Sequence, residues 1–575
     1  MNIFKILRFH VITLIIIASL IVFTYWNLPN TFFQQDEWQG FSEMIYYQSI
    51  DLVSFFNFFF PSDALSHFNP LGSIFALVEF LLFYTDFTPY GWLSILLHVF
   101  NSILLYCFVF TFLKNRKIAA IAGLFFGVNS ISSQAVTWVA AANSYETPTA
   151  FIIVSLIFFH WFLVQEENKR KNLVLSMLML LISLLFHEIG IFLFLFYPII
   201  FLLYKKPKQK KQSQTFFYGI GLFMLVFLLV RIPFFFTSLH ILPTVTDISR
   251  PPITVYPYRL ISISIKSFAG SFFPEKTLIG FSDQVVRLAY PQFVALDNEP
   301  NPYISQLIVF DLVSYIMSIS VICLIVLLIR FTREKKFLEA LVWSFIFVPT
   351  SLLPYAFVLG KAGYSSIFSP QYYYVCSIGT SIIIAITFYC LLQKFSKSGV
   401  GKFLVLSILV LYLISHIYMV RAKVERLVKI SVPIKSFLST VISSYPKLPQ
   451  NVIFYTNSNK AYYGMPDNEK SLPVQVGFGQ MLMVWYQANE KLPGCFYKDA
   501  FLLDILTEGY RQCDDRGFGY FRNYDKLITA IKTNKISPEN VISYSWNEKT
   551  EEFKNITRET QISIKKDIHK DGFTK

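Results

Sequence analysis

The sequence predicts an all-α polytopic membrane protein with about 11 transmembrane helices, followed by a small C-terminal extracytoplasmic α/β domain. Three observations lead to this prediction. Of the 575 residues, 54% are hydrophobic and 15% are charged, and the mean hydropathy of +0.49 is too high for a water-soluble chain. Long apolar runs recur between residues 9 and 420, and short basic loops separate several of them. After residue 420 the pattern changes to short strand-like runs between Pro, Asn and Gly turns.

The first apolar run, residues 9–28, is long enough to cross a bilayer and follows the cations Lys5 and Arg8. It exceeds the apolar core of a signal peptide and ends before Pro29 without a small-residue cleavage site. We therefore expect a retained span with a cytoplasmic N-terminus. The first acidic residue after the run, Asp36, is then outside the membrane.

Basic loops mark the cytoplasmic side, and they order the remaining spans. These loops are residues 114–117, 169–171, 205–211, 330–336 and 394–402. The further expected spans are 91–113, 118–136, 148–164, 173–186, 190–204, 216–236, 304–329, 337–357, 374–392 and 403–420. An odd number of crossings places the C-terminus outside. The short apolar stretch 71–84 would reverse this order if it crossed, so we expect it to be interfacial or re-entrant.

The chain is thus expected to comprise a transmembrane domain, residues 1–420, and an extracytoplasmic C-terminal domain, residues 421–575. The larger outer loops are residues 29–90 and 237–303. Cys495 and Cys513 lie in the outer domain, and the sequence leaves open whether they pair. The formal net charge of +14 comes largely from loops between apolar runs, where Lys and Arg meet anionic headgroups. Membrane lipids, and not nucleic acids, are therefore the expected partners.

Acidic and polar side chains gather at the outer ends of the spans, where they are informative because such groups are costly near lipid. The set comprises Asp36, Glu37, His67, Asn69, His98, Asn101, Glu146, His187 and Glu188. A transporter would tend to hold its binding charges near the bilayer midplane instead. Gathering at one face indicates chemistry at the outer membrane surface.

Structural alternatives exist for these residues. Acidic loop residues such as Glu37 are often solvated surface. His98 and Asn101 share one helix face, and such pairs are often interhelical hydrogen-bonding partners. The three histidines of the set match no local metal motif, so we predict no metal site from them.

The order of these motifs resembles the GT-C superfamily of polyprenyl-phosphate-dependent glycosyltransferases, especially the protein O-mannosyltransferase-like family (glycosyltransferase family 39). The resemblance begins with Asp36-Glu37 in the first outer loop, His-x-x-Pro-Leu at His67 and His-x-x-Asn at His98. It continues at residues 123–130 and 134–139, which resemble the family's third span and second outer loop, where the family has an acid near the position of Glu146. Further similar segments are residues 183–188 and 369–379, and the resemblance covers roughly residues 1–420.

The resemblance implies a GT-C-like fold and an inverting hexosyltransferase at the outer face of the membrane. It implies a polyprenyl-phosphate sugar donor and an acceptor hydroxyl on a glycan, a protein or a lipid. The implied catalytic residues are Asp36, as general base, and Glu37, which would orient the acceptor or a cation. The implied substrate-binding residues are His67, Asn69, His98, Asn101, Glu146, His187, Glu188, Lys361 and Tyr372. No cofactor is certain, and a divalent metal stays open because some families of the superfamily use one and others do not.

Two departures from the family pattern concern the donor phosphate. The family often has Lys where this chain has His187, and Glu-Arg where this chain has Pro370-Gln371. Both changes remove a permanent cation. A protonated His187 would partly replace the lysine. The other candidate cations are Lys361, Arg250, Arg259 and Lys266.

Two other classes of function compete with the enzyme: a transporter of lipid-linked substrates, and a non-catalytic membrane protein that acts through its outer domain. The resemblance favours the enzyme, although likeness of fold does not fix function. We expect an integral protein of a bacterial cytoplasmic membrane, while the endoplasmic reticulum membrane would satisfy the same topology. The lack of N-glycosylation sequons other than Asn555-Ile556-Thr557 favours bacteria.

Overall fold

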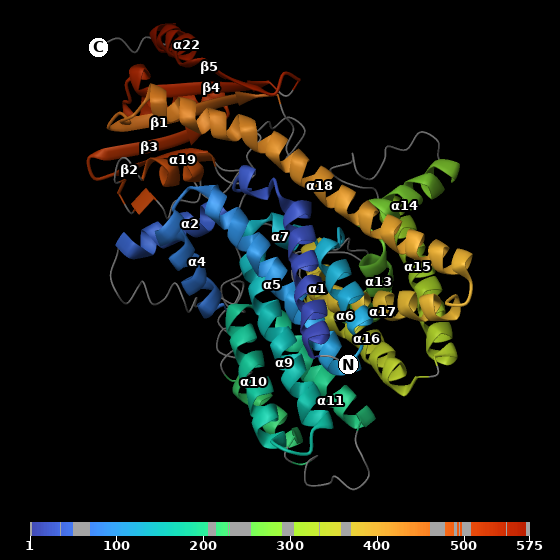
Figure 1. Ribbon diagram of the computed structural model, residues 1–575. Helices are drawn as coiled ribbons and strands as arrows, with labels where there is room; N and C mark the ends of the chain where they lie inside the picture. The colour runs from blue at the N-terminus through green and yellow to red at the C-terminus, as the bar shows by residue number, and fades with distance from the viewer. Residues whose placement is uncertain are drawn as a thin grey trace. The chain divides into compact units, whose positions relative to one another are not determined.

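The structure is a computed structural model (Figure 1), and it describes most of the helical core and most of the C-terminal sheet domain. The described residues are 3–34, 36–49, 69–204, 214, 216–227, 229, 255–289, 304–332, 334–357, 370–459, 478–487, 492–493, 495–496, 508–547 and 549–570. His67, Arg250 and Lys361 lie outside them, and so does the side chain of Asp36. Contacts divide the chain into two compact units. Unit 1 is Met1–Leu28, Phe59–Ala76 and Pro89–Val424, and unit 2 is Pro29–Phe58, Leu77–Thr88 and Glu425–Lys575.

Unit 1 is built from helices. Their bounds are α1 (Ile3–Tyr25), α5 (Phe87–Leu113), α6 (Arg116–Val128), α7 (Gln134–Thr137), α8 (Val139–Ala141), η2 (Ala142–Glu146), α9 (Thr147–Val164), α10 (Lys169–Phe186), η3 (Glu188–Phe192), α11 (Leu193–Tyr204), α13 (Val255–Phe272), α14 (Glu275–Ala289), α15 (Ile304–Phe331), α16 (Lys335–Leu352), η5 (Leu353–Phe357), η6 (Pro370–Tyr372) and α17 (Tyr373–Lys394). Three α-helices are divided between the units: α4 (Pro70–Phe83), α18 (Gly399–Ser444) and α5, whose first two residues, Phe87 and Thr88, belong to unit 2.

The helices confirm an all-α polytopic membrane protein. Among the described residues, seven helices are long and apolar enough to cross a membrane: Arg8–Asn30, Phe87–Leu113, Val139–Val164, Ile308–Phe331, Lys335–Ala356, Pro370–Lys394 and Gly399–Ser444. Three shorter apolar helices are Pro70–Phe83, Glu188–Tyr204 and Phe216–Phe227. Every expected span overlaps a described helix. The orientation of these helices in a membrane stays a prediction.

The expected span 118–136 departs from a single long helix. Asn115 caps α6 by accepting hydrogen bonds from the backbone nitrogens of Lys117 and Ile118, and the helix ends at Val128. The chain then passes through α7 and α8 into η2, a π-helical turn that runs directly into α9. π-Helical turns inside helices are frequent at functional sites. This irregular entry is what presents Glu146.

The last expected span, 403–420, is the first part of a longer helix. α18 has 46 residues, so its length is about 69 Å, roughly twice a bilayer core. Residues 421–432 contain neither Gly nor Pro, and α18 continues through Pro433 to Ser444. The helix leaves unit 1 after Val424 and continues into unit 2.

Unit 2 contains a five-stranded sheet of order β2-β3-β1-β4-β5 (Figure 1). The strands are β1 (Asn451–Ser458), β2 (Gly509–Cys513), β3 (Arg516–Phe521), β4 (Val541–Asn547) and β5 (Glu552–Asn555). β1 pairs in parallel with β3 and β4, and the edge strands β2 and β5 are antiparallel.

Helices cover both faces of this sheet. The helical elements of unit 2 are η1 (Leu28–Asn30), α2 (Asp36–Ser49), α19 (Phe478–Tyr486), α21 (Tyr524–Asn534), η8 (Pro538–Asn540) and α22 (Thr557–Lys570). On one face, Ile453 and Val541 pack with Leu527 of α21 and Ile564 of α22. On the other face, Phe437 of α18 contacts the β4 residue Tyr544, with ring centroids 4.9 Å apart. The sheet is therefore buried on both sides, as parallel strands require.

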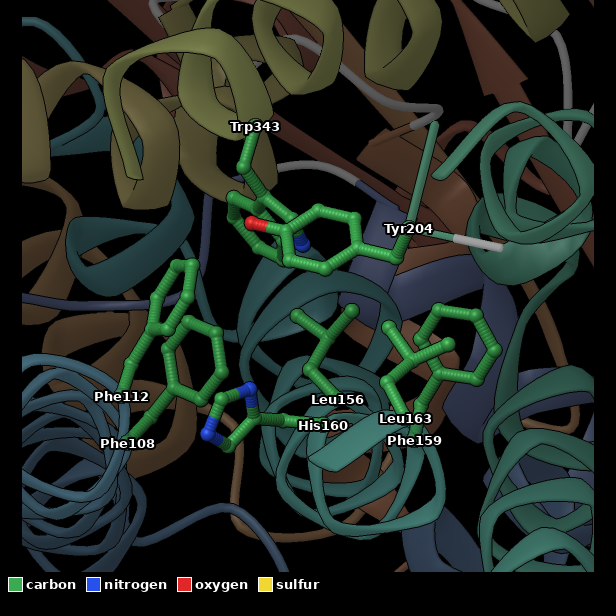
Figure 2. Close-up of a pocket in the computed structure, with 8 residues that line it drawn as sticks. All are labelled: Phe108, Phe112, Leu156, Phe159, His160, Leu163, Tyr204 and Trp343. Atoms are coloured by element: carbon green, nitrogen blue, oxygen red, sulfur yellow. The ribbon is translucent and has the colours of Figure 1, made fainter. Parts of the chain in front are cut away.

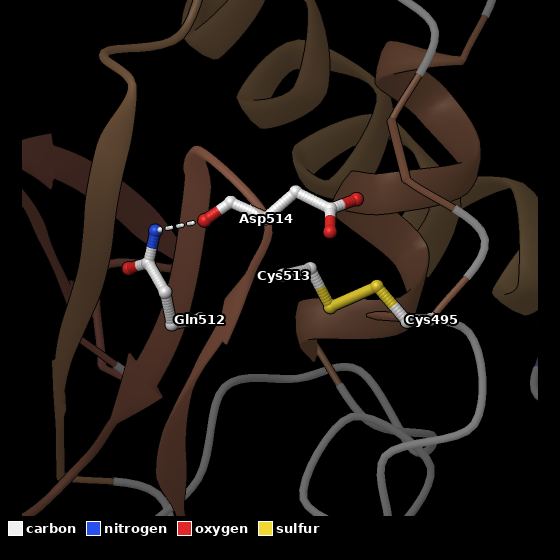
Figure 3. Close-up of a disulfide and its surroundings, with 4 residues drawn as sticks. All are labelled: Cys495, Gln512, Cys513 and Asp514. Carbon is white, nitrogen blue, oxygen red and sulfur yellow. Dashed lines mark hydrogen bonds between the residues drawn. A yellow bond between two sulfur atoms is a disulfide. The ribbon is translucent and has the colours of Figure 1, made fainter.

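A disulfide joins Cys495 to Cys513 at the end of β2, with Cα atoms 6.4 Å apart (Figure 3). The adjoining turn to β3 contains Asp514 at φ 53°, and its backbone oxygen accepts a hydrogen bond of 3.1 Å from Gln512 Nε2. The bond that the sequence left open is thus present. It ties the segment before β2 to the edge of the sheet.

We expect Cys513→Ser to destabilise this edge by about 3 kcal/mol, because the bond closes a loop of 18 residues. Hydrogen exchange of the full chain would show faster exchange at β2 and β3. Cys323→Ser, at an exposed free cysteine, is the matched control. Unchanged exchange in the Cys513 variant would contradict a stabilising role for the disulfide.

Candidate active site

Three residues on one face of α5 begin the candidate site. Ser94, His98 and Asn101 are spaced by four and three residues, so they lie on one side of the helix. Their exposed fractions are 2%, 1% and 0%. This face meets Glu146, the last residue of η2, and Tyr374, in the first turn of α17. We call these five residues the buried polar cluster.

Glu146 is the centre of the buried polar cluster. Its Oε2 lies 2.9 Å from Ser94 Oγ, and its Oε1 lies 3.5 Å from the Tyr374 hydroxyl and 3.7 Å from His98 Nδ1. Its backbone oxygen accepts a hydrogen bond of 2.8 Å from Asn101 Nδ2. The Tyr374 hydroxyl is 2.8 Å from His98 Nδ1 and 3.1 Å from Asn101 Nδ2. These hydrogen bonds hold α5, η2 and α17 together inside unit 1.

The neighbours of Ser94 and His98 assign the protons of this cluster. Ser94 Oγ is 2.7 Å from the backbone oxygen of Val136, which only accepts, so the single hydroxyl proton is donated there. The contact between Ser94 and Glu146 then requires a proton on the carboxyl group. His98 Nε2 lies 3.0 Å from the Gly127 backbone oxygen and donates to it, which leaves Nδ1 to accept from the tyrosine. We therefore assign a protonated Glu146 and a neutral His98, an arrangement that buries no net charge.

Two polar atoms beside this network lack a hydrogen-bond partner within the described residues: the Tyr25 hydroxyl and Asn101 Oδ1. Tyr25 lies on α1, is 0% exposed, and has its ring centroid 5.5 Å from that of His98. Buried polar groups normally have partners. These two atoms are therefore the points at which a ligand hydroxyl or an ordered water would be bound.

Asp36 and Glu37 begin α2 in unit 2. The backbone of Asp36 is described and its side chain is not. Glu37 is buried, and its Oε2 accepts a hydrogen bond of 3.2 Å from the backbone nitrogen of Gln34. A glutamate that bonds back to the nitrogen three residues earlier caps the start of a helix. The sequence predicted that Glu37 orients the acceptor or a cation, and this contact gives its carboxylate a structural task.

A group of aromatic side chains adjoins His187, which the sequence placed at the donor phosphate. Its ring lies 5.5 Å from that of Tyr145, which is 6.0 Å from Tyr372, and Tyr355 lies 4.4 Å from Tyr372. His187 Nδ1 accepts a hydrogen bond of 3.2 Å from the backbone nitrogen of Ile189. An accepting nitrogen carries no proton, so this bond favours the neutral ring over the cation that a phosphate would need.

The remaining expected residues lie at helix starts or outside the described part of the chain. Asn69 precedes α4, and its Oδ1 accepts a bond of 3.4 Å from Ser73 Oγ. Glu188 is half-buried and begins η3. Tyr372 belongs to the group around His187 rather than to the buried polar cluster. His67 and Lys361 are not among the described residues.

Lys266, another candidate for the donor phosphate, is paired with an acid. Its Nζ lies 2.6 Å from Asp311 Oδ1 of α15, and the two side chains are 5% and 9% exposed. A buried charge requires such a partner. The charge of Lys266 is therefore already compensated within the helix packing. Arg259 lies seven residues earlier on α13 and is 4% exposed.

The described helices of unit 1 line both an open groove and a small cavity. An open apolar groove of about 280 Å³ between α11 and the helix Phe216–Phe227 begins at Ile191, three residues after Glu188. Figure 2 shows a far smaller cavity of about 10 Å³, room for about one water. Its lining is Phe108, Phe112, Leu156, Phe159, His160, Leu163, Tyr204 and Trp343. His160 lies 14 residues after Glu146, about 21 Å along the helix, so this cavity is separate from the buried polar cluster.

Within the described residues, no group of three or more His, Cys, Asp or Glu side chains is arranged to hold a metal ion. The side chains of Asp36 and His67 are outside that search.

Of the residues that meet here, the sequence analysis named His98, Asn101 and Glu146 as site candidates, and it did not name Ser94, Tyr374 or the neighbouring Tyr25. Ser94 had a usable signal, because it lies four residues before His98 on the same helix face. Tyr374 had none, since three tyrosines follow Gln371 and the start of α17 decides which one turns inward.

The fold and the buried polar cluster define the class of this chain as a polytopic membrane protein with a polar centre inside its helical core. No protein-family model and no curated protein matches the sequence. Among solved structures, the chain is similar to the oligosaccharyltransferase of Archaeoglobus fulgidus, crystallised with zinc and sulfate, at 12% identity and a TM-score of 0.38. That match covers 83% of this chain and 61% of the other, so the chain spans less than two thirds of the oligosaccharyltransferase.

The chain is also similar to ArnT from Cupriavidus metallidurans bound to undecaprenyl phosphate, at 12% identity and a TM-score of 0.37. This match covers 83% of this chain and 84% of ArnT. Likeness at this level identifies neither an activity nor a substrate.

Proposed function

We propose that this chain is an integral-membrane glycosyltransferase of the GT-C type, which moves a hexose from a polyprenyl-phosphate donor to an acceptor hydroxyl at the outer face of a bacterial cytoplasmic membrane. One observation carries the proposal. Three separate parts of the sequence resemblance, represented by His98 with Asn101, by Glu146 and by Tyr374, meet in one hydrogen-bonded cluster. Residues up to 276 positions apart thus share a site, as an active site of that superfamily would require.

The proposed reaction needs one general base. The leaving group is a phosphate, already a weak base, so it needs charge stabilisation more than a proton. Asp36 takes the proton of the acceptor hydroxyl as that oxygen attacks the anomeric carbon. The bond from this carbon to the phosphate oxygen breaks, its electron pair leaves with the phosphate, and the configuration inverts. Adjacent residues point in different directions, and Glu37 bonds to the backbone of Gln34, so Asp36 is the member of the pair that we assign as base.

The donor would lie with its head near η3. The apolar groove that starts at Ile191 suits an isoprenoid tail, because it is open, lined by apolar side chains and three residues from Glu188. Asn101 Oδ1 and the Tyr25 hydroxyl are suited to sugar hydroxyls. Two cations are poor candidates for binding the donor phosphate. Lys266 is already paired with Asp311, and the His187 ring is favoured in its neutral form by the hydrogen bond that its Nδ1 accepts. Arg250, Arg259 and Lys361 remain as candidates.

The test is sugar transfer by isolated membranes that contain the full chain, supplied with a panel of radiolabelled polyprenyl-phosphate sugars. We expect consumption of one donor and appearance of its label in an acceptor, with no consumption by membranes that lack the chain. Nucleotide sugars are the control donors and should not be used directly. A folded chain that consumes no lipid-linked donor would overturn the proposal and favour a transport or non-catalytic function.

A further inference from the structure

Two parts of the first outer loop belong to the same compact unit as the C-terminal domain. Residues 29–58 and 77–88 are grouped with residues 425–575 in unit 2, although hundreds of positions separate them in the sequence. α2, which begins with Asp36 and Glu37, packs against α19. We propose that the C-terminal domain positions the loop that carries the catalytic base, with Trp485 and Lys435 as positioning residues. The catalytic part of this inference rests on the proposed function.

Trp485 of α19 anchors the loop from the side of the C-terminal domain. Its ring centroid lies 5.9 Å from that of Phe32 and 6.3 Å from that of Trp38. Trp38 follows Asp36 by two residues, is 0% exposed, and lies 5.3 Å from Phe33. Aromatic rings at these separations attract one another beyond simple burial. The residues on both sides of Asp36 are thus fixed by a cluster that Trp485 completes.

Lys435 holds the start of the same loop. This residue lies on α18, and its Nζ donates a hydrogen bond of 3.2 Å to the backbone oxygen of Asn30. The ammonium group also lies 5.6 Å from the centroid of the Phe32 ring, in a cation–π arrangement. The bond to a backbone atom fixes the path of the chain six residues before Asp36.

A third contact ties the far end of the loop to α19. The Tyr84 hydroxyl donates a hydrogen bond of 3.0 Å to the backbone oxygen of Val484, the neighbour of Trp485. Burial raises the pKa of Tyr84 to about 12, so the phenol keeps its proton and remains a donor at neutral pH. Phe80, one turn earlier, stacks on Phe41 of α2 at 4.8 Å. Both arms of the loop are therefore attached to one another and to the C-terminal domain.

These contacts have a consequence for rate rather than for donor binding. A general base acts within hydrogen-bond reach of the proton that it removes. A misplacement of about 1 Å, even by a change far from the chemistry, costs about 100-fold in rate. Loosening the loop would therefore lower kcat, while donor contacts made within unit 1 stay intact.

The experiment compares Trp485→Ala and Lys435→Met in the full chain with two matched controls. Lys429→Met changes a lysine on the same helix that is 76% exposed and pairs with Glu551. Trp546→Ala removes a buried tryptophan that packs on Phe553 within the sheet, at 4.5 Å. The first measurement is hydrogen exchange at residues 36–49. The second is kcat and KM for the lipid-linked donor. To correct for inactive chains, kcat is divided by the fraction of chains that bind the donor.

We expect Trp485→Ala to speed exchange at residues 36–49 and to lower kcat by about 10- to 100-fold with the donor KM unchanged. Trp485→Phe should restore most of the rate, and Lys435→Met should act in the same direction with a smaller effect. Trp546→Ala should speed exchange in β4 and β5 and leave residues 36–49 protected. Lys429→Met should change neither.

Unchanged exchange at residues 36–49 in Trp485→Ala and Lys435→Met would overturn the inference, whatever the activity. So would a normal kcat in a variant with a loosened loop. If the wild-type chain transfers no sugar, the proposed function fails, and the exchange measurement still decides whether the C-terminal domain holds this loop.

Discussion

Asp36→Asn should lower the rate of sugar transfer by about 10²- to 10⁴-fold while the chain stays folded and still binds its donor. Asparagine keeps the size of the side chain and loses the basic oxygen that takes the proton of the acceptor hydroxyl. The measurement is transfer of labelled sugar at saturating donor, with wild type and variant at matched amounts in the membrane.

Two variants serve as controls for Asp36→Asn. Asp86→Asn changes an exposed acid of the same unit whose Oδ1 accepts a hydrogen bond of 3.0 Å from the Thr88 nitrogen, a bond that asparagine can also accept. It should leave the rate unchanged. Glu37→Gln should weaken the cap at Gln34 and lower the rate far less than Asp36→Asn. Full activity of Asp36→Asn would remove Asp36 as the base.

Glu146→Ala should destabilise unit 1 by about 1–3 kcal/mol and abolish transfer. The change removes the carboxyl group, so the buried polar atoms of Ser94, Tyr374 and His98 lose the group that they contact. Glu146→Gln should retain the fold and keep the rate within about tenfold of wild type. The amide nitrogen of glutamine donates to Ser94 as the protonated carboxyl group does, and the amide oxygen still faces the Tyr374 hydroxyl. Thermal inactivation and transfer rate, measured together, separate the two variants.

The comparison between these two variants tests the proton assignment. If Glu146→Gln remains stable and loses as much activity as Glu146→Ala, the site requires an ionised carboxylate. The assignment of a protonated Glu146 would then be wrong. Ser94→Ala is the matched control, because it removes the hydroxyl oxygen that accepts the Glu146 proton and keeps the carboxyl group. We expect this variant to lose stability.

The spans and the polar set were predictable because both depend on local properties. A run of apolar residues such as 91–113 must form a helix in lipid, whatever surrounds it. His98 and Asn101 share a face because they are three residues apart, and the helix alone ensures this. The expected span 118–136 was too long: α6 ends at Val128, and five of the eight residues 129–136 are Asn, Ser or Gln, a polar signal that the span prediction did not use.

The partners within the site were decided by packing between distant segments. The sequence marks Glu146 as an acid near a span, and only the approach of α5 and α17 makes it the centre of a hydrogen-bonded cluster. The same approach selects Tyr374 over Tyr372, which turns to the group around His187. Glu37 likewise gains a capping role from the start of α2.

By itself, the sequence determined that this protein is a membrane-embedded helical chain and marked the polar residues in and near its spans, because hydropathy and helical period act over about 20 residues. The tertiary structure decided which of those polar residues meet, and it grouped the loop of Asp36 with the C-terminal domain. Contacts such as Trp38 with Trp485 join residues more than 400 positions apart. Such contacts leave no periodic trace in a sequence, since they depend on how whole helices pack and not on the neighbours of either residue.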